Sequence, residues 1–416
     1  MSAHTRFLHA LLWFCLLCGL VACGSHRVRD AASERTPVLL ISVDGLRPRD
    51  VTAERMPHLN RLAEHGTRAE GMRPSYPSLT FPNHYTLVTG LRPDRHGIVH
   101  NSTRDAALGE FRLSNRAAVQ DARWWGGEPV WVGAEKAGLR TATLFWPGSE
   151  AAIAGIRPSR WLPFDETMSA DARVDQVLEW LTQPPATRPA FATLYFDAVD
   201  HQSHRHGPDS QQARTAMRDT DAAIGRLIDT LSAHGLLERI NIVMVSDHGF
   251  APVPQGQVIA VEDMAGVDEA LAHSIGQVVG FTPNPIHQAA VETRLLRRHP
   301  PYTCWKKSAL PARWQYGRHA RVPPIVCQMD EGWDALPREA IARREAGMRG
   351  SHGYDPALPS MQATFIAHGP AFRSGHRLPV FDNVDVYPLL MRLLKLPPAP
   401  NDGDSRTIEP ALTPAY

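Results

Sequence analysis

The sequence predicts an α/β fold: a parallel-rich central sheet with helices on both faces, together with an inserted smaller α+β subdomain. Three short apolar runs carry this prediction, and acidic residues follow each of them: 38–43, 192–196 and 241–246. Continuous apolar runs of this length are typical of strands that are buried on both faces of a parallel sheet. Because helical patterns lie between such runs, we expect strands and helices to alternate along the chain.

Further elements fit this alternation in chain order. We expect a helix over 128–137 and a strand over 141–145. A longer helix should follow the second apolar run, where apolar residues recur at helical spacing: Ala213, Met217, Ile224, Leu227, Ile228 and Leu231. The stretch from about 255 to 345 interrupts the pattern because it is rich in proline. We therefore predict a catalytic domain over 37–396, with its insertion at about 255–345, and a C-terminal tail over 397–416.

The pattern of the N-terminal residues predicts that the protein is exported. Residues 1–22 hold one arginine and then an apolar stretch, which is shorter than the about 20 residues that a membrane-spanning helix needs. This pattern indicates a secretory signal peptide. The sequence 20–23, Leu-Val-Ala-Cys, resembles a bacterial lipobox, in which Cys23 becomes the lipid-modified first residue; the alternative is an ordinary signal peptide with an incidental cysteine. Residues 23–36 are polar and should form a tether. We expect a periplasmic, membrane-anchored lipoprotein.

Composition narrows the function. The 416 residues are 43% hydrophobic and 21% charged, with a formal net charge of +1. Such a balance argues against a disordered chain and a strongly basic nucleic-acid binder, so we expect no sequence-specific nucleic-acid binding. Contact with a membrane should occur only through the lipid anchor.

Of the five cysteines, Cys304 and Cys327 remain outside the leader and its lipobox. They form either a disulfide in an oxidising compartment or two buried thiols.

Acidic and histidine residues gather at the predicted strand ends. In parallel sheets, ligands bind beyond the carboxyl ends of the strands. A single aspartate there is explained by a helix cap or a turn, but acidic residues after all three runs favour a shared site. Mixed oxygen and nitrogen ligands suit zinc, and six of them exceed the needs of one ion. The sequence therefore predicts two Zn²⁺ ions, held by Asp44, Asp200, His204, Asp247, His248 and His352.

One metal ligand has an alternative in the sequence, and the nucleophile is still to be located. Asp197 competes with Asp200 as a ligand, and the four-residue step from Asp200 to His204 favours Asp200 because both side chains then share one face of a helical turn. The nucleophile should come from the segment 72–84, which is rich in hydroxyl side chains. A hydroxyl is a poor nucleophile until a neighbouring metal ion or base activates it.

The combined motifs resemble the nucleotide pyrophosphatase/phosphodiesterase family of the alkaline phosphatase superfamily. The resemblance covers about 37–396 and rests on the segments 43–45, 80–83, 200–204, 246–249 and 351–354. Segments 124–129 and 146–150 are most similar to bacterial members. Two positions depart from the family pattern: Ser203 stands where many members have glycine, and Phe164 stands where relatives commonly have tyrosine. Neither departure removes a predicted metal ligand.

The resemblance implies a role for each matching residue. Asp200, His204 and His352 would hold the first zinc, and Asp44, Asp247, His248 and Thr80 the second. Thr80 would attack phosphorus and form a covalent phosphothreonine. Substrate contacts would come from Asn83 and Asn101 to the phosphate, and from Phe81 and Phe164 to the nucleobase. The plainer alternatives are a helix N-cap for Thr80, a turn residue for Asn83 and core aromatics for Phe81 and Phe164.

The resemblance thus implies a phosphodiesterase or nucleotide pyrophosphatase that releases nucleoside 5′-monophosphates. The alternatives on the same two-metal scaffold are a phosphate monoesterase and a phospholipid-type (choline) phosphodiesterase. A sulfatase is disfavoured, because its formylglycine requires cysteine or serine where Thr80 stands. A lipid-anchored binding protein without turnover is the non-enzymatic alternative. The sequence leaves open the physiological substrate, the membrane that carries the anchor and the oligomeric state.

Overall fold

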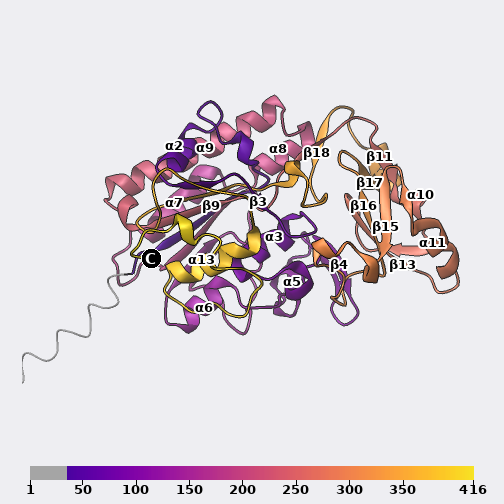
Figure 1. Ribbon diagram of the computed structural model, residues 1–416, viewed down its shortest axis with the longest axis horizontal. Helices are drawn as coiled ribbons and strands as arrows, with labels where there is room; N and C mark the ends of the chain where they lie inside the picture. Colours follow the sequence, from indigo (N-terminus) through magenta and orange to yellow (C-terminus); the bar gives the residue numbers. More distant parts are fainter. Residues whose placement is uncertain (1–34) are drawn as a thin grey trace, which may run out of the picture.

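The computed structural model describes residues 35–416, so the predicted signal peptide, Cys23 and most of the tether lie outside the described residues. A large sheet with helices on both faces forms one part of the molecule, and a smaller antiparallel sheet forms a second part beside it (Figure 1). This arrangement confirms the predicted fold class. Within 35–416, no helix has the length and apolar character needed to cross a membrane.

The central sheet has eight strands, and its middle is parallel. Its order is β20 (His376–Leu378), β2 (Thr67–Ala69), β19 (Phe365–His368), β9 (Asn241–Val245), β1 (Val38–Val43), β8 (Phe191–Phe196), β6 (Thr141–Leu144) and β7 (Arg160–Trp161). The run from β9 to β7 is parallel throughout, and β19 is antiparallel to both of its neighbours. The three predicted apolar runs therefore form three adjacent strands, with β1 in the centre.

Helices cover both faces of this sheet. One face carries α2 (Pro57–Glu64), α7 (Ala170–Leu181) and α9 (Gln211–Ala233), and the other carries α3 (Thr80–Thr89), α6 (Val130–Lys136) and α13 (Val386–Leu393) (Figure 1). Side chains of β1 alternate between the two cores: Val38 and Leu40 pack on one side, and Leu39 and Ile41 on the other. This two-sided burial explains why the strand is apolar at every position except Ser42.

The insertion leaves and rejoins the domain through a two-stranded ribbon of β10 (Ala251–Val253) and β18 (Arg349–Ser351). Its antiparallel sheet has the order β12 (Ala270–Ala272), β13 (Val278–Pro283), β16 (Ile325–Met329), β15 (Tyr302–Lys306) and β14 (Arg298–His299). Cys304 and Cys327 lie opposite each other on β15 and β16 and form a disulfide. The insertion also contains a separate parallel pair of strands, β11 (Val258–Ala260) and β17 (Asp334–Leu336). Its helices are α10 (Val261–Met264), α11 (Gln288–Leu295) and α12 (Arg338–Ala342).

The remaining strands and α-helices are short. They are β3 (Met72–Arg73), α4 (Pro93–His96), β4 (Ser102–Asp105), β5 (Gly109–Arg112), α5 (Arg116–Gln120), α8 (Ala198–His206) and β21 (Phe381–Asp382). The helix expected over 128–137 begins only at Val130, because Pro129 occupies its N-cap in an extended conformation. The segment 397–416, expected as a tail, packs on the domain: Ile408, Ala411 and Leu412 are buried in one of its cores.

Candidate active site

The carboxyl ends of β9, β1 and β8 bring the predicted acidic residues together. Asp44 follows β1 directly, and Asp247 and His248 come two and three residues after the end of β9. β8 leads into α8, whose first turn carries Asp200 and whose last turn carries His204. Because these strands are neighbours and point the same way, their ends deliver the three carboxylates to one place. His352 arrives from the opposite direction, just after β18 at the exit of the insertion.

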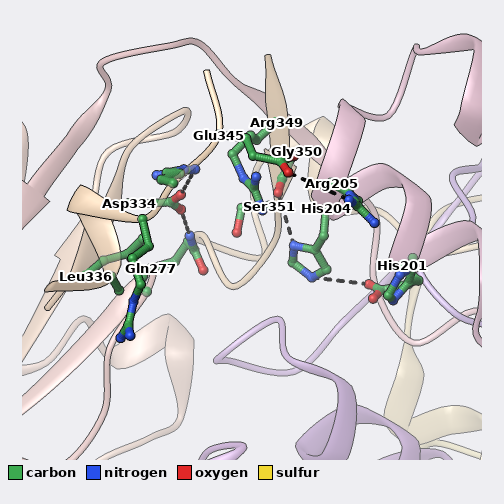
Figure 2. A pocket seen from close by; sticks show the side chains of 15 residues that line it. His201, His204, Arg205, Gln277, Asp334, Leu336, Glu345, Arg349, Gly350 and Ser351 are labelled. Carbon is green, nitrogen blue, oxygen red and sulfur yellow. Dashed lines mark hydrogen bonds and ion pairs between the residues drawn. The ribbon is translucent and has the colours of Figure 1, made fainter. Parts of the chain in front are cut away.

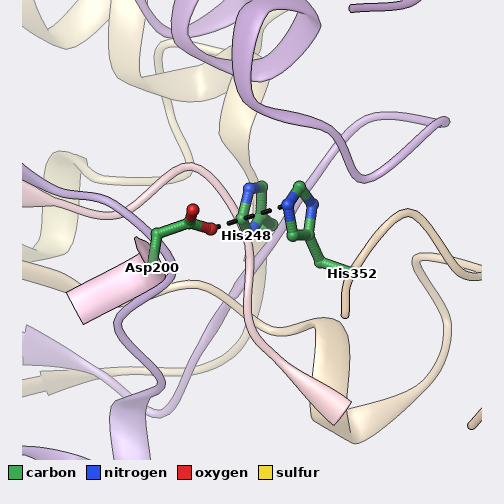
Figure 3. Close-up of side chains that lie close together, drawn as sticks. All are labelled: Asp200, His248 and His352. Atoms are coloured by element: carbon green, nitrogen blue, oxygen red, sulfur yellow. Dashed lines mark ion pairs between the residues drawn. The ribbon is translucent and has the colours of Figure 1, made fainter. Parts of the chain in front are cut away.

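Two sets of side chains in this place could each hold a cation. Ligand atoms of Asp44, Asp247 and His248 all lie within 4.8 Å of one another, and so do those of Asp200, His248 and His352. In the second set, Asp200 Oδ1 lies 3.5 Å from His352 Nε2 (Figure 3). His204 adjoins this set, with its Nε2 atom 3.0 Å from His352 Nε2 and 3.6 Å from Asp200 Oδ1. All six predicted ligands are therefore neighbours.

Backbone carbonyls orient the three histidines. Each Nδ1–H donates to one carbonyl: His352 to Ser78 at 2.9 Å, His204 to Gly350 at 3.1 Å, and His248 to Gly249 at 3.0 Å. A proton on Nδ1 leaves the Nε2 lone pair free, and all three Nε2 atoms face the carboxylates. Fixing the ring tautomer in this way is how proteins prepare histidine for a metal ion.

The electrostatics of the cluster also require a cation. Two Nε2 lone pairs at 3.0 Å repel each other unless positive charge lies between them. The buried oxygens Asp44 Oδ1, Asp200 Oδ1 and Asp247 Oδ2 have no hydrogen-bond donor among the residues of the described chain, and such groups are costly to leave unpaired. Burial, together with the charges of Asp247 and Asp200, raises the pKa of Asp44 well above its ordinary value. Divalent cations would relieve each of these costs, so the donors fit a two-metal centre.

Thr80 lies against this cluster. Its hydroxyl oxygen is 3.3 Å from His248 Nε2. The threonine is the first residue of α3, whereas Leu79 is the N-cap, so Thr80 is not the capping residue itself. Its side chain is therefore available to a ligand at the positive end of the α3 dipole, which favours an anion such as phosphate.

Asn83 does not have the phosphate-binding role expected of it. Its side chain is fully buried, and every hydrogen-bonding position is occupied by neighbours in the protein. Its amide nitrogen donates to the carbonyl oxygens of Pro77 and Leu79 at 2.8 and 2.9 Å. Its amide oxygen accepts from Ser75 N at 2.8 Å and from Asn383 Nδ2 at 2.9 Å. No group of Asn83 remains to meet a substrate, so this side chain organises the loop that precedes α3.

Asn101 contacts the first turn of α3, beside Thr80. Its Oδ1 atom accepts a hydrogen bond from Phe81 N at 2.9 Å, next to Thr80 on α3. No acceptor within the described part of the chain engages its Nδ2 group. The contact with the Phe81 amide fixes the orientation of Asn101 and leaves the NH₂ group free to donate to an oxygen bound beside Thr80.

An aromatic-walled cavity of about 260 Å³ opens next to Thr80. Phe81 and Phe164 both line it, and so does Asp200 at the metal-ligand cluster. Phe81 also packs against Phe111 and Trp125, at ring-centre distances of 6.0 Å in each case. Phe164 rests edge-on against Phe145 and is 39% exposed. Phe164 is therefore free to cover a planar ligand, whereas Phe81 contributes to the core as well as to the cavity wall.

Comparison with known proteins agrees with this geometry. The model of the family described as "Type I phosphodiesterase / nucleotide pyrophosphatase" matches residues 38–355. The chain belongs to this family. It is 36% identical over 387 residues to a venom phosphodiesterase of Crotalus durissus collilineatus, covering 90% of this chain and 46% of the relative. It is 34% identical over 382 residues to an uncharacterized pyrophosphatase/phosphodiesterase of Schizosaccharomyces pombe, covering 89% of this chain and 79% of that one.

A solved structure of a related protein has the same fold as this chain. Murine ectonucleotide pyrophosphatase/phosphodiesterase 5, in an inactive threonine-to-alanine form in complex with AMP, superposes with a TM-score of 0.86 at 31% identity. The match covers 91% of this chain and all of that one. The chain spans about half the length of the venom relatives. These relatives are eukaryotic, so the comparisons confirm the family and give no support to the expected bacterial placement.

Two supporting residues escaped the sequence analysis. The Tyr195 hydroxyl donates to Asp44 Oδ2 at 2.6 Å, and His84 Nδ1 lies 3.3 Å from Asp247 Oδ2 while its Nε2 atom meets Ser42 Oγ at 2.8 Å. Tyr195 holds a candidate metal ligand in place from behind, and His84, whose Nδ1–H donates to the Thr80 carbonyl at 3.0 Å, packs beside a second one. Tyr195 lies one residue before the end of β8. A hydroxyl side chain at this position, close to the strand-end aspartates, is a sequence signal from which its contact with a metal ligand could be predicted.

Proposed function

We propose that the protein is a metal-dependent nucleotide pyrophosphatase/phosphodiesterase that releases nucleoside 5′-monophosphates. One observation carries the proposal: the Thr80 hydroxyl lies 3.3 Å from His248 Nε2, between the two ligand sets and the aromatic-walled cavity. Two bound cations, which we propose to be Zn²⁺, would supply the charge that activates the hydroxyl and stabilises both the attacking and the leaving oxygen.

The residues of the chain would divide the remaining work. Thr80 Oγ forms a bond to phosphorus while the bond from phosphorus to the leaving oxygen breaks. The leaving oxygen keeps the electron pair, and the hydroxyl proton passes to solvent. Water then hydrolyses the phosphothreonine and releases the 5′-monophosphate. Asn101 Nδ2 donates to a phosphoryl oxygen as negative charge develops on it, and Phe164 covers the nucleobase.

The arrangement around Thr80 favours a diester or pyrophosphate over a phosphate monoester. A monoester carries one more negative charge, which calls for an additional cation beside the nucleophile. Arg73 and His84 are near Thr80 in sequence, but Arg73 pairs with Asp382 and His84 is held by Ser42 and Asp247. Neither is free to neutralise the extra charge.

The N-terminal sequence supports a further part of the proposal. We infer that residues 1–22 direct export and that a lipid on Cys23 anchors a periplasmic enzyme of a bacterium. The lipobox-like segment 20–23 supports this inference. Radiolabelled palmitate should be incorporated into the wild-type protein and not into Cys23→Ala, whereas an ordinary signal peptide would leave both variants unlabelled and soluble after cleavage.

Substrate comparison tests the activity directly. The purified protein should hydrolyse bis-p-nitrophenyl phosphate and nucleotide pyrophosphates faster than p-nitrophenyl phosphate, and adenosine nucleotides should yield AMP as the product. Faster turnover of the monoester would reject the diesterase assignment in favour of a monoesterase. Release of phosphocholine from a choline phosphodiester, with no release of AMP from nucleotides, would favour the phospholipid-type alternative.

A further inference from the structure

A second and larger cavity adjoins the metal-ligand cluster on its other side. It has a volume of about 650 Å³ and lies between α8, the ribbon strand β18 and the insertion (Figure 2). Asp200 and His201 line both this cavity and the aromatic-walled one. The two cavities therefore meet at the candidate metal site, with Thr80 lining only the aromatic-walled cavity and His204 only the larger one.

Four arginines line the larger cavity, and one of them, Arg349, makes no ion pair with any residue of 35–416. Arg344 pairs with the buried carboxylate of Asp334, Arg205 lies 3.8 Å from Glu345, and Arg343 lies 2.9 Å from Glu339. No carboxylate or hydrogen-bond acceptor of the described chain lies within bonding distance of the Arg349 guanidinium.

Arg349 is also partly removed from water. Burial, followed by the charge of Arg344, lowers the pKa of its guanidinium from the ordinary value. Figure 2 shows Arg349 between Asp334 on one side and His204 on the other. The charges of Asp334 and Glu345 act on this guanidinium in the opposite direction, but neither carboxylate is within bonding distance. A planar, two-pronged donor of this kind matches the geometry of a phosphate group.

The position of this cavity is the one that a leaving group would need. In an in-line displacement assisted by two cations, one cation lies at the attacking oxygen and the other at the leaving oxygen. Thr80 lies beside His248, in the set with Asp44 and Asp247. The leaving oxygen therefore belongs at the set containing Asp200, next to His204. The cavity with Arg349 opens at that point.

We propose that Arg349 binds the phosphate of the leaving group when a nucleotide pyrophosphate is cleaved, and so discriminates a phosphorylated leaving group from an uncharged one. This inference rests on the proposed function and adds a leaving-group binding residue to it. Diesters whose leaving group is an uncharged alcohol gain nothing from this arginine.

Two substrates that share their nucleotide test the proposal. ATP and the p-nitrophenyl ester of AMP both place adenosine 5′-phosphate in the aromatic-walled cavity, but only ATP releases pyrophosphate. For the metal-loaded Arg349→Ala enzyme, we expect kcat/KM for ATP to fall about tenfold to a hundredfold, the usual effect of losing a charge-assisted hydrogen bond. The value for the nitrophenyl ester should change less than about threefold. Arg349→Lys should restore part of the loss, since it keeps the charge without the two-pronged geometry.

Inhibition supplies an independent measurement. The inhibition constant of inorganic pyrophosphate should rise about tenfold in Arg349→Ala, while that of AMP stays unchanged. Arg338→Ala is the matched control, because Arg338 is an exposed arginine of the same insertion that pairs with Asp263 outside the cavity. A similar loss for both substrates, or a loss for neither, would overturn the leaving-group assignment while the diesterase activity stands.

Failure of the proposed function gives a different result. In that case neither substrate is cleaved by the wild-type enzyme. Pyrophosphate binding by the unmodified and Arg349→Ala proteins, compared by thermal stabilisation, then decides the role of the arginine. Equal stabilisation of the two proteins would reject that role.

Discussion

The edge of the central sheet and the inserted subdomain contribute to the candidate site in different ways. The sheet edge provides every predicted metal ligand except Thr80 and His352, and it does so from three adjacent parallel strands and the helix that follows one of them. The insertion provides walls for the larger cavity, and the strand leaving it carries Arg349 and leads to His352. The predicted reacting groups thus lie on the part of the fold with two-sided packing, and the residue proposed to bind the leaving group lies beside a unit that can vary independently.

Removing the nucleophile should have the largest effect on the sheet-edge site. Thr80→Ala should lower kcat by at least about a thousandfold, because no other hydroxyl replaces the one beside His248. Metal content, measured by mass spectrometry, should remain nearly unchanged because six other ligands are present. Thr80→Ser keeps a hydroxyl and should retain measurable activity. Wild-type rates in Thr80→Ala would reject the covalent mechanism.

A paired substitution separates metal ligands from neighbouring acids. Asp200→Asn should lose one metal ion per chain and most of the activity, whereas Asp197→Asn should keep both ions, because Asp197 pairs with Arg173 at 2.7 Å instead of facing the cluster. Chelation of the wild-type enzyme should abolish activity and lower its melting temperature, since binding at a hundred times Kd stabilises by about 2.7 kcal/mol. Added zinc should restore both properties; restoration by manganese or calcium alone would reject zinc.

Two asparagines allow a finer test of the same edge. Asn101→Ala should reduce kcat/KM by about a hundredfold through loss of a donor to the developing charge, with little change in stability. Asn83→Ala should instead destabilise the fold by about 2–4 kcal/mol, because it leaves several buried groups without partners. Denaturant unfolding and the activity of the folded fraction separate the two outcomes. Loss of kcat in a fully stable Asn83→Ala would restore the phosphate-binding role to that residue.

The disulfide tests the insertion and should have the smallest effect on activity. Replacing Cys304 and Cys327 by serine removes a cross-link between two neighbouring strands that are separated by 23 residues in sequence. For a loop of this length the loss of stability is about 3 kcal/mol. Cleavage of the p-nitrophenyl ester of AMP should remain close to the wild-type rate at temperatures where the variant is folded. A large loss of this activity would show that the insertion supports the metal ligands as well as the cavity wall.

Much of the site could be predicted from the sequence because it follows strand-end chemistry. Asp44 and Asp247 each follow a continuous apolar run, and parallel strands place such positions at one edge. The phosphate-binding role predicted for Asn83 is wrong because the contacts of its side chain are not a local property of the sequence. Asn83 lies three residues after Thr80 in the same helix, yet the side chains point in different directions, and only tertiary contacts with Ser75 and Asn383 show that its amide is occupied.

The sequence by itself determined the fold class, the family resemblance and the candidate metal-ligand set, because apolar periodicity and short motifs are local properties. The tertiary structure decided which amide lies beside the N-terminus of α3, which residues contact Asp44 and Asp247 from behind, and where Arg349 lies relative to the cluster. Asn101 is separated from Thr80 by 21 residues and Arg349 by more than half of the chain. Their proximity to the site depends on helix and ribbon packing, which no local sequence pattern encodes.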